Sequence, residues 1–156
     1  MTGRMLLLDE LERIVRNCCR MFGMLRDEHL GFSPGENMRS LRELANHLSQ
    51  VPAVDLAILR GGKQEEIQAL ERAKDAGSGK DWAETMELGR SELHRYMERL
   101  TLDEFENASG TAFYGRTQTN AQWLLEIVTH IYHHRAQLFV YMKLCGYAVD
   151  TSTLYS

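Results

Sequence analysis

The sequence is poor in the features that mark secreted, disulfide-bonded and membrane-spanning proteins. It has three cysteines in 156 residues, and two of them, Cys18 and Cys19, are adjacent, so there is neither a disulfide framework nor a C-x-x-C metal motif. No apolar run approaches the roughly 20 residues of a membrane span. The apolar run at residues 5–8 is too short for a signal-peptide core. We therefore expect a cytoplasmic protein with no membrane partner.

Positive charge is also scarce. Lys and Arg total 18 against 22 Asp and Glu, giving a formal net charge of -4, which argues against nucleic acid as a partner. Neither phosphate-binding glycine pattern, G-x-x-x-x-G-K or G-x-G-x-x-G, is present, and the nucleophile elbow G-x-S-x-G is missing too. A di-iron carboxylate bundle needs two Glu-x-x-His helices, and the sequence has no such pair. None of these chemistries is supported.

What the sequence does contain is apolar residues at helical spacing. Four series alternate steps of three and four residues, which keeps one helix face turned toward a partner. Four amphipathic helices in a chain of this size predict an all-α four-helix bundle, with residues 1–156 forming a single domain. The series are Leu7, Leu11, Ile14, Cys18, Met21, Leu25; Leu44, His47, Val51, Val54, Ile58; Trp82, Met86, Gly89, Leu93, Tyr96, Leu100; and Trp123, Ile127, His130, His134, Gln137, Tyr141, Leu144.

Local signals place the ends of these helices. Ser40-x-x-Glu43 and Thr119-x-x-Gln122 are capping boxes before apolar runs, so they predict the starts of the second and fourth helices. Pro52 lies inside the second series, where it removes a backbone donor and is expected to kink the helix.

The connections between the helices differ in character. Residues 64–76 are highly charged and could form a short helix. The connection from residue 101 to residue 118 is long for a compact domain, and loops of this length are often functional. It could carry a short hairpin. We predict an up-and-down-like topology with this long loop before the last helix.

Three histidines occupy positions in the core series where apolar residues are expected. His130 and His134 are four residues apart, so both side chains lie on one helix face, and His47 holds an inward position on another helix. A single inward histidine is more often a hydrogen-bonded core residue than a ligand, but three on two core faces favour a metal site. Three imidazoles without a fourth protein ligand leave an open coordination position, which is typical of catalytic sites. His133 is expected at the flank, and His29 and His94 at the surface.

Two segments resemble the signatures of the DinB/YfiT-like family. They are FSPGENMRSLRELANHL at residues 32–48 and THIYHHRAQL at residues 129–138, where the family typically has H-x-x-H-H-R-x-Q. The resemblance implies a four-helix bundle that holds one divalent metal ion, usually zinc or nickel, through His47, His130 and His134. It also implies a homodimer. Similar proteins include thiol S-transferases that use low-molecular-weight thiols such as bacillithiol, mycothiol-dependent isomerases and hydrolases.

Several neighbours of the histidines are candidates for orienting them or for moving protons. Glu126 lies one turn before His130, Gln137 nearly one turn after His134, and Glu43 one turn before His47. For Glu43 the capping box is the simpler explanation. For Glu126 the simpler explanation is an ordinary exposed helix carboxylate.

Four further side chains could contact an anionic substrate. Tyr114 and Arg116 lie in the long loop, and Arg39 and Arg135 lie within the two family segments. The simpler interpretation for each is a solvated surface residue. Among all these candidates, Glu126, Gln137 and Tyr114 are the possible catalytic residues.

The leading hypothesis is a metal-dependent enzyme acting on a small-molecule substrate, either a low-molecular-weight-thiol S-transferase or a hydrolase. The alternatives are a non-catalytic, divalent-metal-binding stress-response protein and a bundle whose histidines only form hydrogen bonds. A second apolar face permits the homodimer, although its residues could instead widen the core. These residues are Leu8, Val15, Phe22, Leu124, Ile131 and Leu138.

Overall fold

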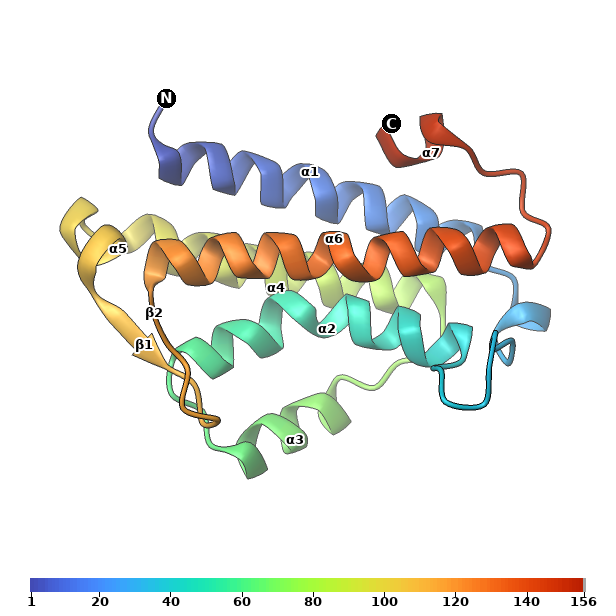
Figure 1. Cartoon of the computed structure of the whole chain (residues 1–156), viewed down its shortest axis with the longest axis horizontal. Helices are drawn as coiled ribbons and strands as arrows, with labels where there is room; N and C mark the ends of the chain where they lie inside the picture. Colours follow the sequence, from blue (N-terminus) through green and yellow to red (C-terminus); the bar gives the residue numbers. More distant parts are fainter. Residues whose placement is uncertain (156) are drawn as a thin grey trace.

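The computed structural model describes residues 1–155, and four long helices dominate it (Figure 1). The helices are α1 (Gly3–Met24), α2 (Leu41–Leu59), α4 (Gly79–Arg99) and α6 (Asn120–Leu144). α1 and α2 each pack against both α4 and α6. The four helices therefore form a square in which α1 lies diagonally opposite α2.

Shorter elements connect and flank the bundle. They are the 3-10 helix η1 (Asp27–His29), α3 (Gln64–Ala73), α5 (Leu102–Asn107), β1 (Ser109–Thr111), β2 (Thr117–Thr119) and α7 (Thr151–Tyr155). β1 and β2 pair antiparallel, with Gly110 opposite Gln118. The long connection before α6 thus holds a helix and a hairpin. No helix among the described residues is both long enough and apolar enough to cross a bilayer.

The helices do not alternate strictly in direction. α1 and α6 run one way, and α2 and α4 run the other way (Figure 1). Arg4 Nη1 at the start of α1 donates to Leu100 O after the end of α4, at 2.6 Å. Tyr141 Oη near the end of α6 donates to Arg39 O before α2, at 3.0 Å. The predicted all-α four-helix bundle is confirmed, and α2 runs parallel to α4 because α3 carries the chain back between them.

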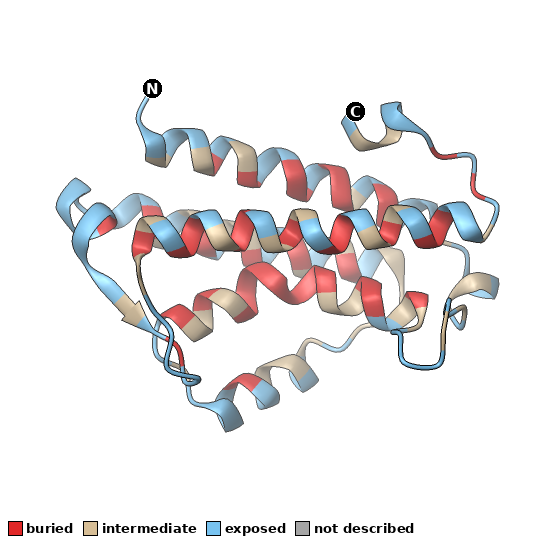
Figure 2. Cartoon of the chain, in the orientation of Figure 1, coloured by how far each residue is buried: buried red, intermediate tan, exposed pale blue. Residues whose placement is uncertain are grey.

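The predicted apolar series line the core (Figure 2). Leu144, the last member of its series, is the exception at 59% exposure, because it lies in the final turn of α6 beyond the packed part of the bundle. The residues of the second apolar face are at most 6% exposed within the single chain, so they widen the core. They therefore provide no surface for a dimer. These are Leu8, Val15, Phe22, Leu124, Ile131 and Leu138.

The caps and the hairpin fix the elements around the histidines. Both predicted capping boxes are formed, at Ser40 and at Thr119, and α2 continues through Pro52 as one helix. The hairpin packs on the end of α2 at Gly110, where a Cβ atom would lie 2.3 Å from Leu59 O. Trp123 Nε1 of α6 donates to Gly110 O at 3.0 Å. A glycine is therefore required where the hairpin, α2 and α6 meet.

Candidate metal centre

The structure brings the three predicted histidines together between α2 and α6. His47 projects from α2, and His130 and His134 project from successive turns of the antiparallel α6. His134 Nε2 lies 3.0 Å from His47 Nε2 and 3.0 Å from His130 Nε2. One ring nitrogen from each histidine lies within 4.8 Å of the other two, a spacing at which the group could hold a metal ion.

Hydrogen bonds at the opposite ring nitrogens define the tautomers of two histidines. His130 Nδ1 is 2.8 Å from Asp55 Oδ2, and His134 Nδ1 is 2.8 Å from Gln137 Oε1. Carboxylate and amide carbonyl oxygens only accept hydrogen bonds, so both Nδ1 atoms carry the hydrogen. When both rings are neutral, their Nε2 lone pairs point toward each other at 3.0 Å.

Two such lone pairs repel each other unless a proton or a metal ion lies between the nitrogens. Zinc binds imidazole nitrogen at about 2.0–2.1 Å, which spaces tetrahedral ligands roughly 3.3 Å apart. The two Nε2 separations from His134 are near that value, and all three ligand nitrogens lie within 4.8 Å of one another. Three neutral imidazoles are also the donors that zinc and nickel accept readily. The residues present therefore fit a divalent ion.

Electrostatics favour neutral rings at two of the three positions. Burial is the main cause that lowers the pKa of His47 to about 3 and the pKa of His134 to about 4, and neighbouring positive groups add to it. The hydrogen bond that His130 donates to Asp55 instead raises the pKa of His130 above its ordinary value. His130 is therefore the first of the three to take up a proton as the pH falls.

Asp55 is the important residue that spacing along one helix does not reveal. Positions one turn from each histidine on its own helix suggested Glu126 as a candidate partner of His130. Glu126 instead accepts from Gln118 Nε2 at 2.5 Å and pairs with Arg116 at 3.0 Å. Asp55 reaches His130 from the neighbouring helix. An available signal was that Asp55 is the only charged residue in the apolar stretch 51–59.

Two other predicted neighbours lie where the spacing suggests. Gln137 orients His134 through its Oε1 atom. Glu43 forms the capping box with Ser40, which was the simpler of its two explanations. His133 is exposed at the flank of the cluster, as expected.

The candidate substrate contacts separate into different environments. Tyr114 is exposed at the tip of the hairpin beside Phe113, and burial together with the nearby charges of Glu126 and Asp55 raises its pKa. Arg116 is engaged by Glu126. Arg39 is exposed, and its positive charge contributes to the lowered pKa of the buried histidines.

Arg135 does not lie at the surface, and it is not available to a substrate. It is buried, and its Nη1 atom donates to Asn17 Oδ1 at 3.0 Å and to Leu154 O at 2.8 Å. Its position on α6 turns it toward α1 and α7, away from the histidines. Both earlier interpretations, substrate contact and solvated side chain, are therefore wrong.

The remaining histidines lie outside the cluster but are less exposed than expected. His29 Nδ1 is 2.9 Å from Tyr147 Oη, and the ring is partly buried. His94 is partly buried as well, with its Nδ1 atom shielded from solvent. Neither belongs to the three-histidine group.

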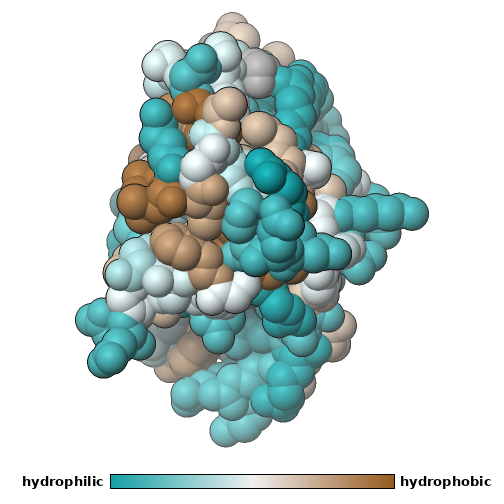
Figure 3. Space-filling model, turned by 90° about the vertical axis from the view of Figure 1, so that its right-hand side faces the viewer, coloured by the Kyte–Doolittle hydropathy of each residue, from teal (hydrophilic) through white to brown (hydrophobic). Residues whose placement is uncertain are grey.

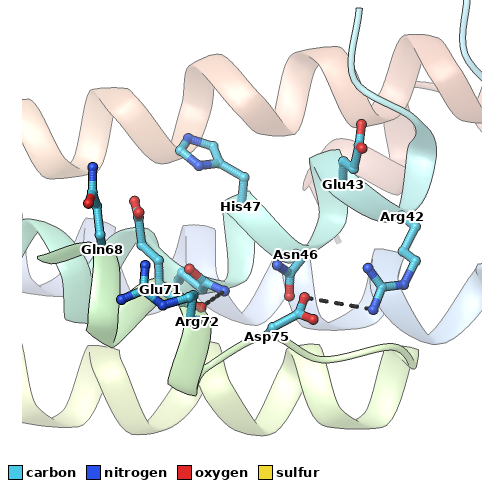
Figure 4. A pocket seen from close by; sticks show the side chains of 9 residues that line it. Arg42, Glu43, Asn46, His47, Gln68, Glu71, Arg72 and Asp75 are labelled. Atoms are coloured by element: carbon cyan, nitrogen blue, oxygen red, sulfur yellow. Dashed lines mark hydrogen bonds and ion pairs between the residues drawn. The ribbon is translucent and has the colours of Figure 1, made fainter.

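A groove between α2 and α3 borders the centre at His47 (Figure 4). It encloses about 620 Å³, and His47 is among the residues that line it. Figure 4 shows the imidazole of His47 pointing from α2 toward α6 at one side of this groove. The centre therefore has an open side, which a site sealed under side chains would lack.

Comparisons with known proteins agree with this architecture. A DinB-family protein from Exiguobacterium sibiricum has a crystal structure with a TM-score of 0.82 and 25% identity, covering 98% of each chain. DinB-like proteins from Bacillus cereus and Bacillus subtilis give TM-scores of 0.72 and 0.69 at 20% and 19% identity, each covering 92% of this chain and 93% of the other. No curated protein sequence matches the chain significantly. The sequence profile of the DinB family matches residues 6–155, so the chain belongs to the DinB family.

Proposed function

We propose that the protein is a metal-dependent enzyme with a mononuclear three-histidine site, acting as a low-molecular-weight-thiol S-transferase or as a hydrolase. The observation that carries the proposal is the convergence of three imidazole nitrogens beside an open groove. Three protein ligands leave a position free for a substrate atom. A purely metal-binding stress-response protein, the alternative function, needs no such opening.

The residues of the chain have separate tasks in this proposal. Asp55 and Gln137 hold His130 and His134 in the tautomer that presents Nε2 to the ion. A divalent zinc or nickel ion, when bound, supplies Lewis acidity that lowers the pKa of a thiol or a water molecule. Arg39, whose positive charge helps to lower the pKa of His47, is the candidate contact for an anionic substrate group, and Tyr114 is the candidate contact from the hairpin.

The test is metal-dependent turnover by protein purified without a histidine tag. The protein, loaded with zinc or nickel, is mixed with monochlorobimane and one thiol at a time: bacillithiol, mycothiol, glutathione, coenzyme A or cysteine. We expect conjugation with at least one thiol, and its loss in His130→Ala. If every thiol fails, the transferase proposal is withdrawn and metal-dependent ester hydrolysis is assayed. Hydrolytic activity should then follow the ionisation of a water molecule with a pKa of about 7. Metal binding without either activity would favour the stress-response alternative.

We also propose a homodimer, on a surface other than the one first considered. Leu125, Val140 and Leu144 of α6 are 51%, 52% and 59% exposed. Figure 3 faces the end of the molecule where α6 finishes, and hydrophobic side chains gather there on one side of a largely hydrophilic surface. Sedimentation at micromolar concentration tests the proposal, and a monomer would contradict it.

A further inference from the structure

The groove between α2 and α3 contains several charged side chains, and some of them have partners. Arg42 of α2 forms an ion pair with Asp75 at 3.7 Å, drawn as a dashed line in Figure 4. Glu43 accepts from the Ser40 backbone N–H at 2.8 Å and so caps α2. The two carboxylates, Asp75 and Glu43, are therefore already engaged.

Glu71 of α3 is different. It lines the groove together with His47 and is half-buried. Within residues 1–155 its carboxylate has neither an ion pair nor a hydrogen bond. Its backbone is nevertheless held in place, because Gln50 Nε2 donates to Glu71 O at 3.2 Å, and Gln50 is buried. In Figure 4 the side chain rises from α3 toward the side of the groove that carries His47.

The other carboxylates around the centre have partners. Asp55 holds His130, and Glu126 is engaged by Arg116 and Gln118. Protonation of either carboxylate would remove the negative charge that strengthens these contacts. Glu71 has no such contact to weaken, and the groove in which it lies also gives water access to its carboxylate.

We propose that Glu71 is the proton acceptor for a thiol that binds in this groove beside His47. This inference rests on the proposed function. The S–H bond breaks, its electron pair stays on sulfur, and the proton moves to a carboxylate oxygen of Glu71, from which it passes to solvent water. Proton transfer by a positioned side chain typically accelerates a reaction by 10²–10⁴-fold. A group with this task changes rates and leaves the equilibrium affinity for the thiol unchanged.

The variant is Glu71→Gln, which keeps the shape of the side chain and removes the acceptor. Its control is Glu65→Gln, because Glu65 is an exposed residue of the same helix that does not line the groove. Cobalt is loaded into each protein as a spectroscopic substitute, and metal content is measured first. Binding of 2-mercaptoethanol, an uncharged thiol, is then followed by stopped-flow absorbance of the sulfur-to-cobalt charge-transfer band.

We expect equal cobalt content in all three proteins. The association and dissociation rates of the thiol should both fall by about 10²-fold in Glu71→Gln, with an unchanged dissociation constant, whereas Glu65→Gln should match the native protein. Unchanged rates in Glu71→Gln would overturn the role of Glu71 and leave the proposed thiol function standing. A raised dissociation constant with an unchanged association rate would overturn it too, because Glu71 would then bind the ligand itself. Absence of the charge-transfer band in the native protein would overturn the thiol function and this inference with it.

Discussion

Replacing Asp55 by Asn tests how the centre is held in its binding geometry. The asparagine side chain has nearly the same shape, and its Oδ1 atom can still accept from His130 Nδ1. What is lost is the negative charge behind the 2.8 Å hydrogen bond. The tautomer of His130 is therefore expected to persist, while the ring becomes less basic and a weaker ligand.

The expected magnitude follows from the role of the contact. Mutating the residue that orients a metal-ligating histidine typically costs 10–100-fold in metal affinity. This corresponds to about 1.4–2.7 kcal/mol. The difference in metal affinity between the native protein and Asp55→Asn should become smaller at acidic pH. Asp55 also raises the pKa of His130, so protons compete more strongly with the metal ion in the native protein.

The assay is zinc titration against a chelating indicator near neutral pH, with Glu126→Gln as the control. Glu126 is also a carboxylate close to His130, but it bonds to Arg116 and Gln118. We expect Glu126→Gln to stay within about twofold of the native affinity, since it contacts no ligand histidine. Equal affinities for Asp55→Asn and the native protein would refute the reasoning, and so would equal losses in the two variants.

Four further predictions concern stability, pH and metal binding. The metal-free protein should lose stability as the pH falls from about 6.5 toward 4, because the unfolded chain then binds protons on His47 and His134 that the folded chain, with lowered pKa values, does not. The metal-induced rise in melting temperature should also be smaller at about pH 5 than at about pH 8, and equal rises would contradict the ligand assignment. Gly110→Ala should lower the free energy of unfolding in urea by about 1–3 kcal/mol, because the added Cβ meets Leu59 O, and an unchanged midpoint would contradict the close approach. Arg135→Met should cost about 1–3 kcal/mol, because it leaves Asn17 Oδ1 and a backbone carbonyl without their donor, yet zinc stoichiometry should not change.

The sequence was sufficient to predict the features that depend on spacing along one helix. The apolar series predicted four core faces, and the same series placed His47, His130 and His134 inward. The capping boxes at Ser40 and Thr119 marked helix starts correctly, because they are local hydrogen-bond patterns.

Features that depend on how helices lie against each other were not predictable in the same way. Asp55 touches His130 only because α2 and α6 are antiparallel neighbours in a particular register. The burial of Leu8 and Leu124 depends on each bundle helix packing against two others, which gives it a wider core face than a single series implies. Arg135 is buried because α7 packs over it, and no pattern in the local sequence predicts that contact.

Metal content is the most direct test of the proposed three-histidine metal site. Tag-free protein is saturated with zinc or nickel, freed of excess ion by gel filtration and measured by elemental analysis, alongside a variant in which His47, His130 and His134 are all replaced by Ala. We expect one divalent ion per chain in the native protein and none in the variant. A native protein that retains no metal, or a variant that retains as much as the native protein, would contradict it.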